Sequence, residues 1–191
     1  MHTHSIELLE PRIAPAVMLV SPFIGTYTDE DGDIVNVRFS KPLLTTGNVA
    51  SIIATTPTGV GDHLDKIDLN GLIGASGTDI FVVTRVAGNG DGLANVGIID
   101  ATGVDLGAVQ VHGDLGQILA GDSATDTRGM RSLAVHSFGI ADTVAGTPPG
   151  GSDVLGFVGS LTVGVDMIGA SFRVGAAAVA DARIGSVFIG G

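Results

Sequence analysis

One pattern of apolar and polar residues recurs through the second half of the chain. A six-residue phrase with apolar residues at its first, fourth and sixth positions begins at positions 106, 130, 158 and 184, at intervals of 24, 28 and 26 residues. The four phrases read LGAVQV, MRSLAV, VGSLTV and IGSVFI. A period in the twenties is typical of one turn of a solenoid. The pattern therefore predicts a stack of similar units.

Each phrase predicts a short β-strand with one apolar face. Its fourth and sixth positions lie two residues apart, so a strand points both to the same side. The first position is out of phase with this alternation. The small residues that follow it, Gly107 and Ala108 in the first unit, predict a bend that turns it inward as well. The predicted inward pairs are Val109 and Val111, Leu133 and Val135, Leu161 and Val163, and Val187 and Ile189.

A second short strand follows in two of the units. Gly and Asp residues mark a corner after Val111 and after Val163, and residues 117–120 and 171–174 then resume a β-prone pattern. Two or three strands per unit, joined by tight corners, predict a right-handed parallel β-helix, which is a solenoid, over residues 95–191. Residues 174–185 are the best candidate for a short helix, with a loop as the alternative.

The first half of the chain predicts a cap for this solenoid. Val35, Val37 and Phe39 alternate with polar residues after an Asp-Gly turn, and residues 78–86 form a strongly β-prone run. An uncovered coil would expose unpaired backbone groups, so we expect residues 23–94 to form a β-rich capping region continuous with the solenoid. Prolines break residues 1–22, which we interpret as a sorting-like or flexible N-terminal segment.

The amino-acid composition and net charge limit the kinds of molecule that this protein could bind. The chain is 45% hydrophobic with only 4% aromatic residues and 30 glycines, which suits thin stacked β-layers. Twenty acidic residues against nine basic ones give a formal net charge of −11, which would repel a phosphate backbone. We therefore expect no nucleic-acid partner. No uninterrupted apolar run is long enough for a helical membrane span, and the N-terminus lacks the pattern of a standard signal peptide.

Several phrases resemble a family of extracellular β-solenoid repeat proteins of Planctomycetes and Verrucomicrobia. They are "LEPRIAPA" at residues 9–16, "TDEDGDIVNVRFSKPLLT" at 28–45, the stretch at 90–122 and the phrases "GSLTV" and "GSVFIGG". The first is similar to the LEPR-XLL element found near the start of exported proteins of those bacteria. The resemblance implies an extracellular or cell-surface location and a repetitive β-architecture, and it supplies no catalytic residue.

The sharpest chemical motif is the acidic turn "DEDGD". Asp29, Asp31 and Asp33 offer three carboxylates at alternating positions, and hard oxygen ligands of this kind suit Ca²⁺. A twelve-residue EF-hand loop counted from Asp29 would need a Glu where Ser40 stands, so that motif does not apply. The alternative is a solvated hairpin turn in which Asp-Gly provides the positive φ angle. Apart from possible Ca²⁺, no cofactor is expected.

Two further pairs align between repeat units. His112 and His136 follow equivalent strands, and a histidine ladder on an outer face is a second metal candidate, with plain surface histidines as the alternative. Asp114 and Asp166 also align, as paired acids for polysaccharide cleavage would. Phe138 occupies the equivalent position in the unit between them by this alignment, and corner aspartates more commonly cap backbone amides.

These observations favour a non-catalytic exported structural, surface or adhesion module over an enzyme, because no acid, base and nucleophile converge on one motif. The alternatives are a β-helix protein that binds or cleaves polysaccharide and a calcium-dependent adhesion module. Expected partners are polysaccharide or other surface proteins. The last phrase ends without a polar capping element after Ile189, so we also expect either a fragment or end-to-end self-association.

Overall fold

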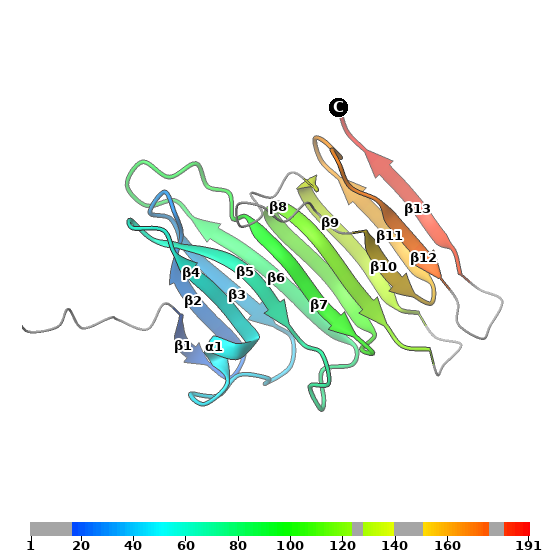
Figure 1. The fold of residues 1–191 in the computed structure, drawn as a ribbon, viewed down its shortest axis with the longest axis horizontal. Coiled ribbons are helices and arrows are strands. Elements are labelled where there is room, and N and C mark those ends of the chain that lie inside the picture. The colour runs from blue at the N-terminus through cyan, green and yellow to red at the C-terminus, as the bar shows by residue number, and fades with distance from the viewer. Residues whose placement is uncertain (1–16, 124–127, 140–150, 176–181) are drawn as a thin grey trace, which may run out of the picture.

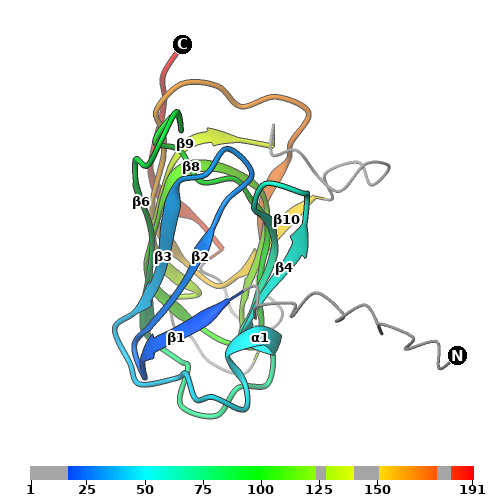
Figure 2. The ribbon, with the colours of Figure 1, turned by 90° about the vertical axis from the view of Figure 1, so that its left-hand side faces the viewer.

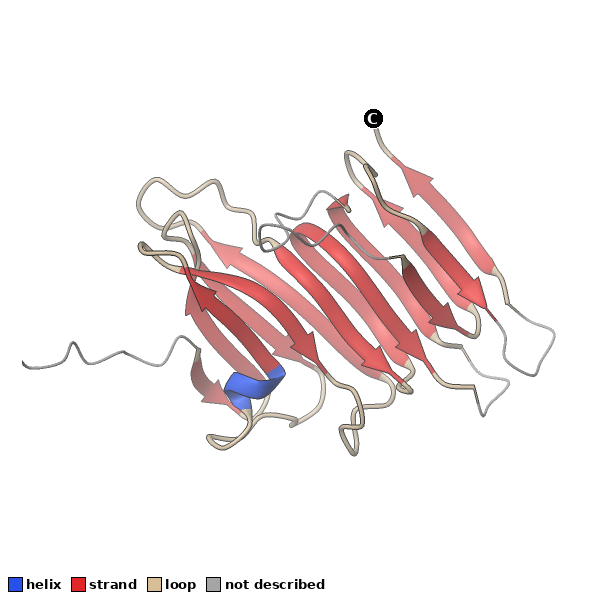
Figure 3. Ribbon diagram, in the orientation of Figure 1, coloured by secondary structure: helices blue, strands red, loops and turns tan. Residues whose placement is uncertain are grey.

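The protein is almost entirely β-structure. A computed structural model describes residues 17–123, 128–139, 151–175 and 182–191. Within these residues, thirteen strands join in one large mixed sheet, and the single helix is the four-residue α1 (Val49–Ile52). Figure 3 shows how little of the chain is helical. The predicted all-β class is confirmed.

The strands follow one another along the molecule from the N-terminal end to β12 and β13 at the other end (Figure 1). Their bounds are β1 (Met18–Ser21), β2 (Ile24–Thr28), β3 (Ile34–Phe39), β4 (Ile53–Pro57), β5 (Asp62–Asp68), β6 (Thr78–Arg85), β7 (Val96–Thr102), β8 (Leu106–Gly121), β9 (Met130–Phe138), β10 (Ser152–Leu155), β11 (Val158–Val163), β12 (Phe172–Gly175) and β13 (Ile184–Ile189).

The pairing changes from antiparallel to parallel along this direction. At the N-terminal end, β1, β2, β3 and β6 pair antiparallel in that order, and β4 pairs antiparallel with β5. The pairs β6–β8 and β5–β7 are parallel, and so are all later pairs. Parallel pairing thus begins at Asp62, inside the region predicted as the cap. The strand β1 likewise lies inside the predicted N-terminal segment, whose residues 1–16 lie outside the described residues.

Strand β8 connects two parallel ladders. Its first part pairs with β6 and β9, and its second part pairs with β7 and β10. One ladder continues through β11 to β13 and the other ends at β12. Figure 2 shows the strands in two facing layers, with β3 and β6 in one and β4 and β10 in the other. Apolar side chains from both layers form one core between them.

The predicted register of the repeat is confirmed. The first phrase positions pair in one row, from Leu106 to Met130, Val158 and Ile184, and the sixth positions pair in another, from Val111 to Val135, Val163 and Ile189. All of these residues on β8, β9 and β11 are buried. The second strands predicted at residues 117–120 and 171–174 are present within β8 and β12, the latter shifted by one residue. Residues 176–181 of the helical candidate lie outside the described residues.

The sequence pattern predicted a bend at the small pair that follows the first phrase position. The structure has no bend there, so this prediction is wrong. Leu106 and Val109 are both buried, yet Gly107 and Ala108 lie inside the continuous strand β8. The glycine is required by close approach, because a Cβ at position 107 would overlap the carboxylate of Asp79 on the neighbouring strand. Glycines at the same position of later strands meet a backbone carbonyl of the preceding strand in the same way.

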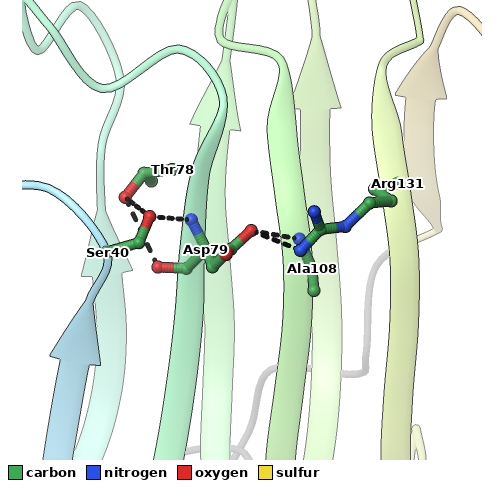
Figure 4. Close-up of polar contacts among 5 residues, drawn as sticks. All are labelled: Ser40, Thr78, Asp79, Ala108 and Arg131. Carbon is green, nitrogen blue, oxygen red and sulfur yellow. Dashed lines mark hydrogen bonds and ion pairs between the residues drawn. The ribbon is translucent and has the colours of Figure 1, made fainter.

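Hydrogen bonds of Asp79 on β6 link this strand to the residue that follows β3, to β8 and to β9 (Figure 4). Its Oδ1 accepts hydrogen bonds from the backbone N–H of Ala108 on β8 and from the Arg131 guanidinium on β9, each at 2.8 Å. Its backbone N–H donates to the Ser40 hydroxyl at 2.8 Å, just after β3. One carboxylate therefore holds the start of β8 in register with both of its neighbours.

Replacement of Asp79 by Ala should lower the free energy of unfolding by about 1–2 kcal/mol, because the Ala108 N–H then loses its acceptor. Urea unfolding measures this change. Arg131→Ala is the matched control: the arginine side chain is half exposed, so its loss should cost less than about 0.5 kcal/mol. Equal losses in the two variants would contradict the structural role assigned to the backbone contact.

Candidate functional site

The acidic turn "DEDGD" connects β2 to β3 as a hairpin. Thr28 pairs with Ile34, and the Asp29 N–H donates to the Asp33 carbonyl at 2.9 Å. Gly32 has a φ of 99°, a left-handed conformation that glycine adopts without the steric cost of a Cβ. The predicted hairpin turn is confirmed. Asp29 also forms an isolated parallel bridge with Asp62, which brings the start of β5 beside the turn.

Three chain segments surround a hollow of about 190 Å³ beside this turn. They are the end of β2 with the acidic turn, the start of β5, and the loop between β6 and β7. We call it the acidic hollow. The first two segments line it with Tyr27, Asp29, Glu30, Asp31, Asp62 and His63, and the loop adds Asp91 and Asn95. Five carboxylates therefore face one small volume.

Asp33 holds the loop that closes the hollow. Its side chain is fully buried, and its two carboxylate oxygens accept the backbone N–H groups of Ala87 and Gly92, each at 2.7 Å. A Cβ at Gly90 would overlap the same carboxylate, so the loop backbone lies directly on it. Asp33 was predicted as a metal ligand, but the structure commits both of its oxygens to positioning residues 87–92, and it does not line the hollow.

Asp29 and Asp31 form the centre of the acidic hollow. One oxygen from each of Asp29, Asp31 and Asp33 lies within 4.8 Å of the others. Burial, a hydrogen bond to the Asp31 carboxylate and the charges of Asp31 and Asp33 raise the pKa of Asp29 to about 7. The same hydrogen bond, with that from the Asp91 N–H, lowers the pKa of Asp31. Below a pH of about 7, Asp29 is therefore protonated and hydrogen-bonded to the Asp31 carboxylate.

Two buried side chains, Tyr27 and His63, also line the acidic hollow. The Tyr27 side chain is 3% exposed, and its hydroxyl has no hydrogen-bond partner among the described residues. Burial, followed by the charges of Asp29, Asp62 and Glu30, raises the Tyr27 pKa far above its usual value. The His63 ring is buried too: Nδ1 lies 3.3 Å from a Glu30 oxygen, and Nε2, which has no hydrogen-bond partner in the described part of the chain, lies 4.0 Å from an Asp65 oxygen.

The two histidines of the predicted ladder lie on neighbouring strands, His112 on β8 and His136 on β9. His112 is exposed on β8, and neither it nor His136 joins any group of three metal-ligating side chains there. The Nδ1 of His136 lies 3.3 Å from Asp114 and 3.4 Å from the Ser137 hydroxyl. A Ser-His-Asp relay needs the serine and the aspartate on opposite ring nitrogens, so this trio is not a catalytic triad.

One strand, β9, separates Asp114 on β8 from Asp166, which follows β11. Asp114 pairs with Ser137, and the Phe138 N–H donates to the Asp166 carbonyl. Ser137 rather than Phe138 therefore separates the two acids, because Gly113 adds one residue to β8 and shifts the register after Val111. Two strand spacings amount to about 9.6 Å, and Asp114 already pairs with His136. No converging acid pair results.

Comparison with protein-family models, with curated protein sequences and with solved structures finds no match. The resemblance to extracellular repeat proteins stays a prediction. Among the described residues, no helix has both the length and the apolar character needed to cross a membrane.

Asp29→Asn should remove a pH-dependent loss of stability. Because the folded-state pKa of Asp29 is raised from 3.8 to about 7, ionisation of this carboxyl destabilises the fold as pH rises through that range. Asparagine keeps an oxygen to accept the Asp33 N–H and offers N–H donors to Asp31. At about pH 8 the variant should gain on the order of 2 kcal/mol over the parent chain, and at about pH 4 nearly nothing.

Urea unfolding at several pH values, with a chelator present, measures this difference. Asp166→Asn is the matched control, since that side chain is exposed and distant in sequence from the hollow. A gain at pH 8 that is equal in the two variants would assign the effect to net charge instead of burial.

Proposed function

We propose that the chain is a non-catalytic structural module of an exported or cell-surface protein, built as a right-handed parallel β-solenoid with a strand cap. The observation that carries the proposal is the continuous parallel register, in which the same phrase positions pair from β8 through β9 and β11 to β13. A stack of parallel strands of this kind can be lengthened by the addition of similar units, which suits a structural scaffold. The cap is supported by β2, whose Gly25 lies against Ile53 of β4.

The lack of a converging catalytic set supports a structural role. In the described part of the chain, the Ser137, His136 and Asp114 trio has the wrong geometry for a relay, and Asp166 stands apart from Asp114. Export is supported only by the resemblance to extracellular repeat proteins.

The far end of the stack supports a role in assembly. Among the described residues, β13 pairs with β11 alone and β12 with β10 alone. Val187 and Ile189 are 54% and 48% exposed, whereas their counterparts Leu161 and Val163 on β11 are buried. Unpaired backbone groups beside exposed apolar side chains are a template for another strand. The other end carries antiparallel strands, so two open ends meeting about a two-fold axis form a closed dimer.

The chain should therefore dimerise through β13, and Ile189→Lys should weaken the dimer by at least about tenfold, since a lysine ammonium would be buried in the apolar contact. Sedimentation velocity over a range of concentrations measures the change. Ile73→Lys is the matched control, because Ile73 is 96% exposed in the loop between β5 and β6 and should leave association unchanged.

A chain that stays monomeric at all concentrations would contradict assembly through this end. If the purified chain also cleaved a polysaccharide, and Asp114→Ala abolished the cleavage, the enzymatic alternative would replace the structural proposal.

A further inference from the structure

The acidic hollow concentrates more negative charge than its surroundings balance. Its lining holds Asp29, Glu30, Asp31, Asp62 and Asp91, and His63 is the sole basic side chain in that lining. Like charges gathered in a partly buried volume repel one another, so a cation at this point would relieve a cost that the fold otherwise carries.

A second observation points independently to a ligand. The Tyr27 hydroxyl is buried and has no hydrogen-bond partner among the described residues, although the side chain lines the hollow. The His63 Nε2 does not add to this observation, because it lies 4.0 Å from an Asp65 oxygen outside the lining. Buried polar groups in folded proteins almost always have a partner. Tyr27 lines the hollow together with Asp29, Glu30 and Asp62, yet none of these carboxylates accepts a hydrogen bond from its hydroxyl. A ligand bound in the hollow would supply the missing acceptor.

The donor set selects the kind of cation. The carboxylates of the hollow and the Asn95 amide are hard oxygen ligands, and one oxygen of Asp29 lies within 4.8 Å of one oxygen of Asp31. Ca²⁺ binds about six to eight oxygens at roughly 2.3–2.6 Å, so two oxygens that bind the same ion lie at most about 5 Å apart. Zn²⁺ prefers nitrogen and sulfur, and Nδ1 of the one histidine here is already paired with Glu30.

We propose that the acidic hollow binds Ca²⁺, with Asp29 and Asp31 as the central ligands and Glu30, Asp62 and Asp91 completing a site drawn from three chain segments. Tyr27 donates a hydrogen bond to a ligand of the ion. Asp33 acts as a positioning residue, because it holds the 87–92 loop that carries Asp91 against the hollow. The proposal goes beyond the structural role and does not rest on it.

The ion would tie the acidic turn, the start of β5 and the β6–β7 loop together at the capped end of the sheet. Ca²⁺ should therefore raise the melting temperature of the chain, because only the folded state assembles these three segments into one site. Dimerisation through β13 at the opposite end should not depend on Ca²⁺, so failure of one proposal leaves the other standing.

The sequence offers a specific optical probe. Tyr27 is the only tyrosine, and the chain has no tryptophan. Tb³⁺, which takes the oxygen sites of Ca²⁺, emits strongly when a nearby tyrosine transfers energy to it. The full chain, stripped of metal with a chelator, should show Tb³⁺ emission on tyrosine excitation, and Ca²⁺ should displace Tb³⁺ competitively. Mg²⁺, which demands a tighter octahedral geometry, should compete at least about tenfold less well.

Variants locate the site. Asp31→Asn retains an oxygen to accept the Asp91 N–H but loses the charge, and should weaken Tb³⁺ and Ca²⁺ binding by at least about tenfold. Glu30→Gln, at a half-exposed position, should also weaken binding and guards against a folding defect in the first variant. Tyr27→Phe should abolish the emission while Ca²⁺ still raises the melting temperature. Asp166→Asn is the control and should change none of these readouts.

Three results would overturn the proposal. The first is absence of Tb³⁺ emission together with no Ca²⁺-dependent rise in melting temperature. The second is emission that survives both Asp31→Asn and Glu30→Gln in variants shown by circular dichroism to be folded. The third is an equal loss of binding in Asp166→Asn, which would assign the effect to the overall negative charge. Stronger competition by Mg²⁺ than by Ca²⁺ would likewise overturn the assignment of the ion.

Discussion

The in-register parallel ladder through β8 is the constraint on which the rest of the structure depends. Parallel backbone hydrogen bonding sets neighbouring strands about 4.8 Å apart and places equivalent residues in rows. An inward row must then be apolar on every strand, as the row from Leu106 to Met130 and Val158 is. In the next row, Gly159 and Gly185 each lie against a backbone carbonyl of the preceding strand, which a Cβ would overlap. The repeat is the sequence signature of this geometry.

The ladder also determines where chemistry is possible. Inside the stack, the strand spacing determines which polar side chains meet, so Asp114 pairs with His136 on the next strand while Asp166 stays one strand further away. At the N-terminal end the pairing changes from parallel to antiparallel, and the repeat no longer controls which residues meet. There Asp33 binds the 87–92 loop, and Asp29 bridges to Asp62. The acidic hollow is a consequence of that change in pairing.

The two ends of the molecule therefore carry different properties. The β12 and β13 end exposes backbone edges and apolar side chains, which fits association with similar strands. The capped end gathers a large share of the negative charge around Tyr27 and His63. A cation bound there would stabilise the cap without covering the opposite edge. The proposed assembly and the proposed ion binding therefore involve opposite ends of the molecule.

The sequence alone determined the repeat register, because a residue spacing copied from unit to unit reappears as rows in any parallel stack. It also determined the acidic hairpin, since alternation around Asp-Gly is a local signal. Tertiary structure decided the rest. Gly113 shifts the register so that Ser137 pairs with Asp114. The Asp33 carboxylate accepts a hydrogen bond from the Gly92 N–H in the β6–β7 loop. Tyr27, Asp62 and Asp91 line one hollow, although more than thirty residues of sequence separate Tyr27 from Asp62. No periodic or local pattern relates those residues, because only the packing of a hairpin, a strand and a loop at the end of the stack brings them together.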